Sequence, residues 1–373
     1  MKKLNTKNLM NLITCAVFLA FIFSYTVLNL FTPEKTFSEN ENRVLAKAPD
    51  ASIKNILFGD FDTEFENWFS DQFIGRDSWI QAKSTMRRTA GAIENNEVYF
   101  GGNGRLIQQF LDFDRKILDS NISYVNQFAK DTGIRMNIML VPGASQGEKK
   151  FLPLFASNVN EAKLLEEIAS SFSDQNFIDA AAKIGTGQDM YFRTDHHWNA
   201  AGAYAGYTAI CQSVLKKEPE EFTYTKVSDD FRGTMYSRSG AFRTKGDELY
   251  RMDPVIPYKA EMTYENGNTS NSLFVDSRLQ EKDKYTYYID GNHAHVTIRT
   301  SNPSGKKAVL IKDSFSHILV PYLCAEYSEI ELFDLRYYRD QVSRSITDPA
   351  TTDVYLIYGL ETFCSDTSLA VLW

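Results

Sequence analysis

The stretch KKAVLIKDSF, residues 306–315, decides the fold that we predict for this chain. Its apolar part, AVLI at 308–311, is short, continuous and bounded by polar residues. Such runs are typical of strands that are buried on both faces, as in the middle of a parallel sheet. Ser314 follows at the point where this strand should end and the next helix should begin.

On both sides of this strand, helix-like and strand-like segments alternate. Apolar residues at helical or strand spacing occur in this order: helix 115–131, strand 134–142, helix 164–172, strand 177–179, helix 200–215, strand 329–336 and strand 353–359. Such alternation predicts an α/β sandwich with a mainly parallel sheet. The apolar period is lost at about 218–303, where we expect a β-rich insertion over the carboxyl ends of the strands.

The N-terminal segment predicts a membrane anchor. Residues 9–31 form an apolar run without a formal charge, long enough as a helix to span a bilayer. Lys2, Lys3 and Lys7 precede it, which favours a cytoplasmic N-terminus and a globular part outside the cytoplasm. A cleaved signal peptide is the alternative, but the run is long for one and no A-x-A-like site follows before Pro33. We therefore expect an uncleaved single-pass anchor.

The chain divides into three predicted parts. Residues 1–31 form the cytoplasmic tip and transmembrane anchor, residues 32–60 an extended juxtamembrane segment, and residues 61–373 the catalytic domain. At the start of that domain, residues 61–92 have the spacing of a helical hairpin interrupted at Gly75. Two short strands across a Gly/Asn turn should follow it.

Composition excludes some classes of function. A formal net charge of −8 and the lack of a Lys/Arg block argue against nucleic acid as a partner. The four cysteines have no CxxC spacing, so neither a zinc knot nor a disulfide framework is indicated. Cys211, Cys324 and Cys364 lie among apolar neighbours and should be core residues.

The stretch Asp195-His196-His197-Trp198 supplies the groups that a serine nucleophile needs. Residues two apart in an extended segment face the same side, so Asp195 can orient His197 while His197 takes the proton of Ser314. His196 then points away, in a structural role or as the base instead of His197. Trp198 packs beneath the base or stacks on a sugar ring, and we prefer packing. The serine could also be only a helix N-cap.

Metal chemistry is the rival interpretation of these histidines. Asp195, His196 and His197, together with His293 and His295, could form a His/carboxylate site. Adjacent histidines diverge on an extended chain, however, and the sequence has no HExxH motif or cysteine pair. We therefore predict no metal and no other cofactor.

Several motifs carry a resemblance to a known family. They are SENENR (38–43), WFSDQF (68–73), RD (76–77), VYFG (98–101), TDHHW (194–198) and DSF (313–315). On these motifs the sequence resembles the DHHW family and, more distantly, the alginate O-acetylation proteins of the AlgX/AlgJ type. The resemblance implies an SGNH-hydrolase-like three-layer sandwich. It also implies Asp195 as orienter, His197 as base and Ser314 as nucleophile.

The match to the SGNH motifs is incomplete. Lys312 stands where a GDS-type motif has glycine. The Gly and Asn of the SGNH oxyanion hole have no certain counterparts, and Gly291 and Asn292 are the candidates from the insertion. His196 and Trp198 complete the set of expected substrate-contacting residues.

The resemblance implies transfer of acetyl groups through an acyl-serine to hydroxyls of an exopolysaccharide. A membrane-bound acyltransferase would supply the acetyl group across the membrane. The chain ends at Trp373, soon after the last expected strand, so we expect no appended carbohydrate-binding module and no tight polymer binding from one. The alternatives are a carbohydrate O-acetyl esterase with the same triad, a non-catalytic component of a glycan assembly or export complex, and a metallophosphoesterase.

Overall fold

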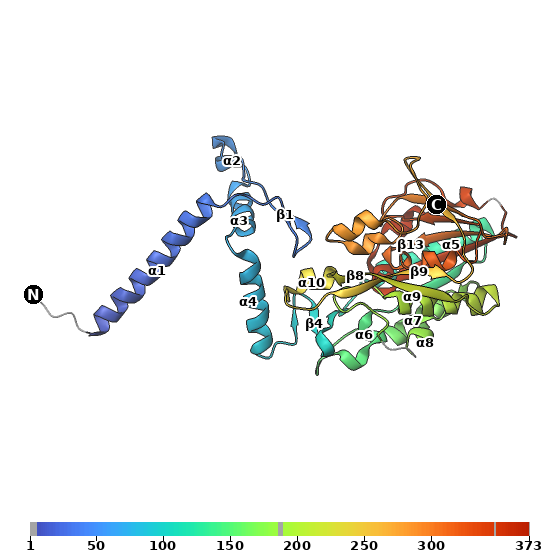
Figure 1. Cartoon of the computed structure of the whole chain (residues 1–373), viewed down its shortest axis with the longest axis horizontal. Helices are drawn as coiled ribbons and strands as arrows, with labels where there is room; N and C mark the ends of the chain where they lie inside the picture. Colours follow the sequence, from blue (N-terminus) through green and yellow to red (C-terminus); the bar gives the residue numbers. More distant parts are fainter. Residues whose placement is uncertain (1–5, 186–188, 347, 373) are drawn as a thin grey trace, which may run out of the picture. The chain divides into compact units, whose positions relative to one another are not determined.

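The chain divides into two units, Met1–Met86 and Arg87–Trp373 (Figure 1). The computed structural model describes residues 6–185, 189–346 and 348–372. The globular domain was predicted to begin at residue 61. The division between the two units falls instead within the helix α4 (Arg76–Thr89). The segment from residue 61 to Met86, near the C-terminal end of α4, therefore groups with the N-terminal part.

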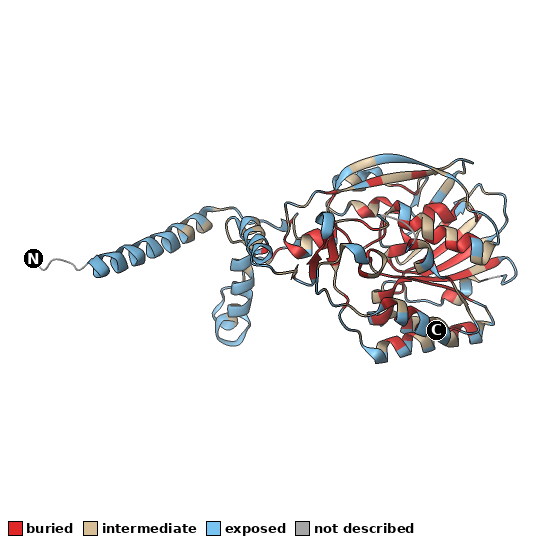
Figure 2. Cartoon of the chain, turned by 90° about the horizontal axis from the view of Figure 1, so that it is seen from below, coloured by how far each residue is buried: buried red, intermediate tan, exposed pale blue. Residues whose placement is uncertain are grey.

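The first unit is mainly helical. Its first helix, α1 (Thr6–Phe31), is exposed along nearly all of its length (Figure 2). By length and composition this helix could cross a membrane, a property that it shares with signal sequences. The predicted helical hairpin is present as α3 (Phe61–Asp71) and α4, and Gly75 between them has φ +69°. Only glycine adopts such a conformation without steric cost.

The juxtamembrane segment is not wholly extended, contrary to the sequence analysis. It contains the helix α2 (Ile53–Phe58) and a pair of two-residue strands, β1 (Phe37–Ser38) and β2 (Arg43–Val44). The side chain of Ser52 caps α2 by accepting a hydrogen bond from the N–H of Asn55.

The second unit is built on an eight-stranded sheet. In spatial order its strands are β11 (Thr269–Ser270), β10 (Ala260–Tyr264), β12 (His295–Thr300), β14 (Glu329–Phe333), β13 (Lys307–Lys312), β15 (Thr352–Gly359), β6 (Asn137–Val141) and β7 (Asn176–Phe177). From β14 to β7 all neighbours are parallel, whereas β10, β11 and β12 pair antiparallel. The prediction of an α/β fold with a mainly parallel sheet is confirmed.

Alternate residues of the central strands enter two separate cores. On β13, Leu310 belongs to one core and Ile311 to the other, and on β15 the same holds for Ile357 and Leu356. The first core also takes residues of α8 (Ala180–Ile184), α9 (Ala200–Ile210) and α11 (Val320–Leu323). The second takes residues of α5 (Arg115–Thr132), α7 (Glu161–Ser171) and α12 (Leu360–Ser365). Helices thus cover both faces of the sheet, and Figure 2 shows the buried residues gathered there.

The ends of two predicted helices have the expected chemistry. Gly133 ends α5 in the left-handed conformation with φ +67°. The side chain of Asn199 begins α9 by accepting hydrogen bonds from the N–H groups of Ala201 and Gly202. Asn199 directly follows the tetrad, so this cap holds the end of the DHHW segment against the start of a helix.

The insertion at 218–303 does more than cover the strand ends. Its first part is a hairpin of β8 (Phe222–Phe231) and β9 (Asp247–Pro254). Its second part supplies β10, β11 and β12, which extend the main sheet beyond β14. This extension was not predicted. Its strand β12 pairs antiparallel with β14 and so satisfies the backbone groups along that side of β14.

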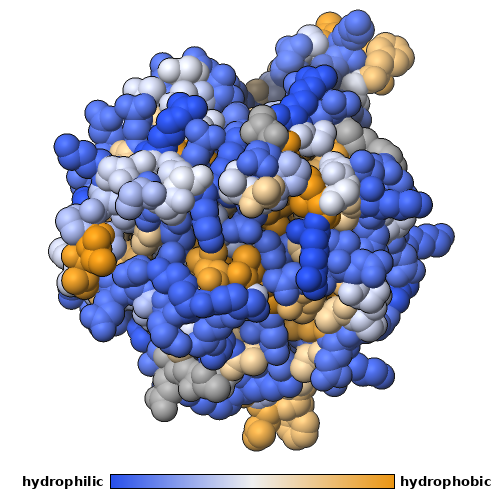
Figure 3. Space-filling model, turned by 90° about the vertical axis from the view of Figure 1, so that its right-hand side faces the viewer, coloured by the Kyte–Doolittle hydropathy of each residue, from blue (hydrophilic) through white to orange (hydrophobic). Residues whose placement is uncertain are grey.

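Smaller features complete the unit. The predicted short strands form a three-stranded sheet of β3 (Glu94–Asn95), β4 (Val98–Phe100) and β5 (Leu106–Gln108). The helix expected after β13 is a 3-10 turn, Ser314–Ser316, followed by the short α11. The helix α12 after the last strand was not predicted. Figure 3 shows one face of the molecule, mostly hydrophilic, with apolar atoms at the bottom of a central hollow.

The three cysteines of the second unit are buried and free, in agreement with their predicted place in the core.

Candidate active site

Ser314 lies directly beyond the carboxyl end of β13, and the carboxylate of Asp313 fixes this position. Asp313 Oδ1 accepts the N–H of Phe315 at 2.9 Å, and its Oδ2 accepts the N–H of Gly359 at 2.8 Å. Because Gly359 ends the neighbouring strand β15, one buried side chain ties two strand ends together. The half-buried Ser314 is thereby held at the edge of the sheet.

The structure brings Asp195, His197 and Ser314 together. His197 Nε2 lies 2.8 Å from Ser314 Oγ, and His197 Nδ1 lies 2.5 Å from Asp195 Oδ1. The carboxylate favours a proton on Nδ1, which leaves Nε2 as the acceptor for the serine hydroxyl. These contacts have the geometry of a nucleophile, its base and the group that orients the base.

Asp195 is buried and has four hydrogen-bond donors around it. Oδ1 also accepts the N–H of His197 at 3.0 Å, while Oδ2 accepts the N–H and the hydroxyl of Thr234 at 2.8 and 3.0 Å. Burial alone would raise the pKa of Asp195, but the two histidines and these hydrogen bonds outweigh it and hold the pKa well below its usual value. The carboxylate is therefore ionised at neutral pH. Thr234 begins α10 (Thr234–Ser239), in the insertion, and was not anticipated.

Tyr285 is a second site residue that the sequence analysis missed. Its ring stacks on the imidazole of His197 with centroids 4.1 Å apart and planes 12° apart. Its hydroxyl donates a hydrogen bond to the backbone oxygen of Ser314 at 3.0 Å. Tyr285 therefore contacts both the imidazole of His197 and the backbone of Ser314. It lies in a 3-10 turn of the insertion, Lys284–Tyr287, where no sequence motif marks it.

The other two residues of the tetrad have separate partners. Trp198 is fully buried and donates from Nε1 to the backbone oxygen of Phe315 at 2.8 Å, so it packs under the site. His196 is half-buried, and its Nδ1 lies 2.7 Å from the hydroxyl of Thr234. Burial and the neighbouring His197 lower the pKa of His196 to about 4, so it is neutral at pH 7. Since His197 bonds Ser314, His196 is not placed as the base.

Lys312, the residue that departs from a GDS-type motif, has a structural partner. It is buried, and its Nζ lies 3.3 Å from Asp334 Oδ2 and 3.0 Å from His317 Nε2. Arg336 also binds Asp334, with 2.6 Å between its guanidinium and Oδ2. Burial lowers the pKa of Lys312. The departure from glycine therefore adds a buried charge cluster beneath the serine.

Gly291 and Asn292 form hydrogen bonds with residues other than Ser314. The N–H of Gly291 is donated to the backbone oxygen of Tyr288 at 3.2 Å, and Asn292 Oδ1 accepts from Arg336 at 3.1 Å. Within the described residues neither forms a hydrogen bond with Ser314. Their predicted oxyanion role thus has no geometric support. The first N–H of the turn after the serine, that of Phe315, is likewise already donated to Asp313.

The histidines are not gathered into one centre. His293 lies near Asp290 and His295 near Glu331, on different partners. Potential ligand atoms of Asp195, His196 and His197 lie within 4.8 Å of one another. Both ring nitrogens of His197 are engaged, however, by Asp195 and the serine. A metal ion there would have to displace one of these hydrogen bonds.

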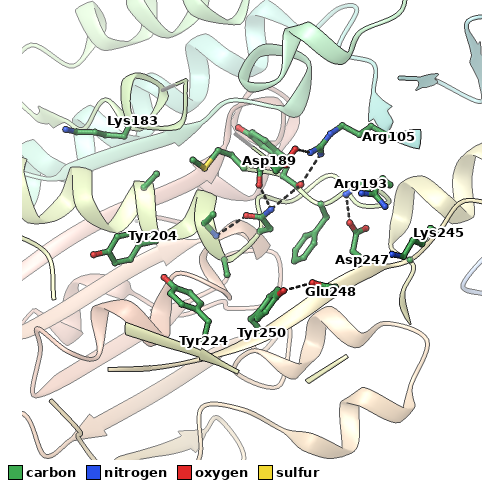
Figure 4. Close-up of a pocket in the computed structure, with 18 of the residues that line it drawn as sticks. Arg105, Lys183, Asp189, Arg193, Tyr204, Tyr224, Lys245, Asp247, Glu248 and Tyr250 are labelled. Atoms are coloured by element: carbon green, nitrogen blue, oxygen red, sulfur yellow. Dashed lines mark hydrogen bonds and ion pairs between the residues drawn. The ribbon is translucent and has the colours of Figure 1, made fainter. Parts of the chain in front are cut away.

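Two cavities flank the DHHW segment. The smaller, about 290 Å³, is lined by Asp195 and His196 together with Phe315, the residue after the serine. The larger, about 900 Å³, is lined by tyrosines and by several charged side chains (Figure 4). Its tyrosines are Tyr191, Tyr204, Tyr224 and Tyr250. Among Asp195, His197 and Ser314, only Asp195 lines one of these two cavities, and it lines the smaller one. The smaller cavity lies beside the turn that contains Ser314, because Phe315 of that turn is in its wall.

The site and the fold can now be compared with known proteins. Residues 173–333, which contain the tetrad, match the family model described as "DHHW protein". A DHHW family protein from Eubacterium siraeum has a similar structure, with a TM-score of 0.65 and 23% identity, covering 75% of this chain and 96% of its own. No curated protein matches the sequence significantly.

Two further structures are similar at lower identity. PatB1 of Bacillus cereus, solved with a sulfonyl adduct, has a TM-score of 0.60 and 19% identity, covering 72% of this chain and 96% of its own. The O-acetyltransferase domain of Pseudomonas putida AlgJ has a TM-score of 0.47 and 12% identity, covering 74% and 98%. At these identities the likeness to PatB1 shows the fold alone, and the likeness to AlgJ carries no argument about activity.

The geometry defines a class of protein. It is an α/β protein in which a serine, a histidine and an aspartate are joined by hydrogen bonds at the edge of the sheet. Residues 173–333 of this chain are similar to the DHHW family.

Proposed function

We propose that this chain is a serine-dependent O-acyltransferase that moves an acyl group, most simply acetyl, onto hydroxyls of a cell-surface or secreted polysaccharide. The observation that carries this proposal is the contact of 2.8 Å between His197 Nε2 and Ser314 Oγ, with Asp195 behind the imidazole. A hydroxyl in this setting is activated as a nucleophile.

The proposed reaction has two halves. Ser314 Oγ attacks the acyl carbonyl of the donor while its proton moves to His197 Nε2, and the departing group takes that proton. The product is an ester on Ser314. A sugar hydroxyl then gives its proton to the same nitrogen, attacks the ester and releases the serine. In each half the ionised Asp195 stabilises the transient imidazolium.

The fit of the site to this chemistry comes from burial as well as from distance. Asp195 and His197 are both buried, so the charge that forms on the imidazole faces a carboxylate in an environment of low dielectric. Tyr285 and Phe315 enclose the ring, with centroid distances of 4.1 and 5.0 Å. Such a base is held in one orientation before the substrate binds.

The proposed location follows from α1. We propose that this helix remains as an anchor, with the N-terminus in the cytoplasm and the second unit outside it. Lys7 and the lysines before it are the basis for this orientation. A membrane-bound acyltransferase would then supply the acyl group from the cytoplasmic side, and the polysaccharide would be the acceptor.

An acyl-labelling experiment tests the nucleophile. The purified chain is incubated with an activated acetyl ester and digested, and the peptide that contains Ser314 is examined by mass spectrometry. We expect one added acetyl group on Ser314 and none in Ser314→Ala. A Ser314→Ala protein that is still acetylated and still transfers acetyl groups to a glycan would overturn the proposal.

The same triad would serve an O-acetyl esterase, which is the second candidate. The two differ in whether the acyl-serine meets water or a sugar hydroxyl. Competing a glycan acceptor against water in one assay separates them. A transferase yields mainly acylated glycan when acceptor is present, whereas an esterase yields free acid regardless of acceptor.

If Ser314 is neither acylated nor needed in the cell, the chain acts instead as a non-catalytic component of a glycan assembly or export complex. A His197→Ala chain that folds and supports the normal phenotype would establish this non-catalytic role.

A further inference from the structure

The cavity beside Ser314 carries acidic groups that the triad does not use. Besides Asp195 and His196, its wall includes the carboxylates of Glu161 and Glu361 and the guanidinium side chain of Arg238. Glu161 begins α7, Glu361 lies in the first turn of α12, and Arg238 lies in the last turn of α10. Three separate helices therefore bring two carboxylates and one cation to one cavity of about 290 Å³.

Glu161 is the more deeply placed carboxylate. Only 1% of it is exposed, and it accepts hydrogen bonds from the N–H of Gly143 at 2.7 Å and the hydroxyl of Ser145 at 2.5 Å. Burial raises its pKa, while these two donors and the more distant charge of Lys149 oppose the rise. Both hydrogen bonds suit an ionised acceptor.

Glu361 is held by a single side-chain donor. Gln108 Nε2 lies 2.7 Å from its Oε1. Burial, reinforced by the negative charge of Glu161, raises the pKa of Glu361 to about 7, although Gln108 and Arg238 act in the opposite direction. At neutral pH this group is therefore divided between its acid and ionised forms, and above pH 7 it is mostly ionised.

Arg238, the one cationic side chain that the described residues contribute to the wall, is already paired. Arg238 forms a salt bridge with Glu97, which does not line the cavity. His196 is neutral at pH 7, as described above, and Asp195 is held by hydrogen bonds from His197 and Thr234. Neither Glu161 nor Glu361 forms a salt bridge with a described residue of the cavity wall, and Glu361 is mostly ionised above pH 7.

From this charge balance we propose that the cavity holds the sugar of the acceptor that receives the acyl group, and that it admits neutral or amino sugars and excludes uronates. This inference rests on the proposed acyl transfer to a glycan. A uronate would bring a third carboxylate beside two others that have no free cation to offset them, and like charges in a partly buried site repel strongly. An ammonium group would instead pair with Glu361, and a neutral ring would meet both polar side chains and apolar ones such as Phe110 and Leu360.

The experiment compares three acceptors with the full-length chain and one activated acetyl ester as donor. The acceptors are N-acetylated chito-oligosaccharide, its deacetylated amino form, and oligogalacturonate of the same length. Acylation of Ser314 without acceptor is measured first, by mass spectrometry, and transfer to each acceptor second. At pH 8 we expect transfer to the neutral and amino sugars to exceed transfer to the uronate by about tenfold or more.

The discrimination should also respond to pH and salt in the unmodified chain. Lowering the pH from 8 to 6 protonates Glu361, so the ratio of neutral to uronate transfer should fall. Comparing two acceptors at one pH cancels the effect of pH on the shared base His197. Higher ionic strength should lower the same ratio, because salt screens repulsion between charges that solvent can reach.

Glu361→Gln removes one of the two charges and should reduce the ratio severalfold, and Glu161→Gln should reduce it as well. Glu166→Gln is the matched control, because Glu166 is exposed on α7, the helix of Glu161, and does not line the cavity. It should leave the ratio unchanged. Acylation of Ser314 in each variant reports whether the site is intact, so a misfolded variant is recognised.

The outcomes separate this inference from the proposed function. A chain in which Ser314 is never acylated contradicts both. A chain that is acylated but does not prefer neutral or amino sugars over the uronate contradicts the acceptor inference alone. The acceptor inference is also contradicted if the ratio of neutral to uronate transfer is the same in Glu361→Gln, Glu161→Gln and Glu166→Gln as in the unmodified chain.

Discussion

The ring of Tyr285 lies on the imidazole of His197, with 4.1 Å between centroids and 12° between planes, and the same tyrosine donates its hydroxyl to the backbone oxygen of Ser314. One side chain of the insertion thus contacts both the imidazole of His197 and the backbone of Ser314. The insertion therefore forms part of the candidate active site and does not merely cover it. Tyr285 is a positioning residue in this arrangement, since its contacts act through His197 and the serine backbone.

The two contacts of Tyr285 can be separated by mutation. Tyr285→Phe keeps the stacked ring and loses the hydroxyl, and we expect acyl transfer to fall only a few fold. Tyr285→Leu loses both contacts, and because a misplaced base costs about 10²-fold in rate, a fall of that order in kcat is expected. The measurement is kcat and KM for both variants. Equal losses in the two variants would show that stacking does not position the imidazole.

Asp195→Asn tests the group that orients the base. An amide cannot favour the required imidazole tautomer as a carboxylate does, and the analogous change in a serine protease lowers kcat about 10⁴-fold. We expect a loss of about 10³–10⁴-fold in the rate of Ser314 acylation. Thr234→Val is the comparison, because it removes one hydroxyl bond to Asp195 and keeps the backbone one. Its loss should be near tenfold, and an Asp195→Asn chain within threefold of wild type would contradict the triad.

A sulfonyl fluoride should modify Ser314. The serine oxygen attacks sulfur, fluoride leaves, and the proton passes to His197, so activity is lost and the Ser314 peptide gains the sulfonyl mass. Because general-base help is worth about 10²–10⁴-fold, labelling should slow by at least about 10² in His197→Ala.

Ser304→Ala is the control for that labelling, since Ser304 is an exposed serine outside the site. It should be modified at the wild-type rate. Labelling at other serines with Ser314 unmodified would argue against an activated nucleophile.

The environment of Glu331 on β14 allows a prediction of how the free energy of unfolding depends on pH. It accepts from His295 at 3.0 Å and Ser345 at 2.6 Å and forms a salt bridge with Lys307. Burial alone would raise its pKa, but these partners outweigh it and lower the pKa to about 2. A depressed carboxyl pKa stabilises the fold above the unfolded value, near 4.3, and this contribution is lost as pH falls toward 2.

Glu331→Gln should therefore lower the free energy of unfolding by about 2–3 kcal/mol at pH 7. The deficit relative to wild type should shrink as the pH falls from about 4 to 2. Urea unfolding at several pH values measures it, with Glu166→Gln as an exposed control. A deficit that is independent of pH would assign the loss to packing and not to charge.

Much of this architecture could be predicted because the determining signals are local. The apolar run before Ser314, the helical spacing of α5 and α9 and the caps at Gly133 and Asn199 depend on neighbours within a few positions. The placement of Asp195 and His197 on one side likewise follows from a spacing of two.

The parts that could not be predicted depend on residues far apart in the chain. Thr234 reaches Asp195, Tyr285 reaches His197, and the extra strands reach β14 from an insertion without apolar periodicity. No local pattern encodes such contacts, because they arise only when separate segments pack on the same sheet edge. The helix α12 was not predicted because it is too short to show the helical spacing of apolar residues.

Periodicity within the sequence was sufficient to indicate the α/β class and the apolar N-terminal helix. Motif spacing made Asp195, His197 and Ser314 candidates, and the family resemblance implied their roles. The tertiary structure alone decided that the imidazole of His197 bonds the serine. It also decided that Tyr285 bonds Ser314, that Thr234 bonds Asp195, and that Glu161 and Glu361 line the neighbouring cavity. Those facts depend on distances and burial, which exist only once the sheet has brought its strand ends together.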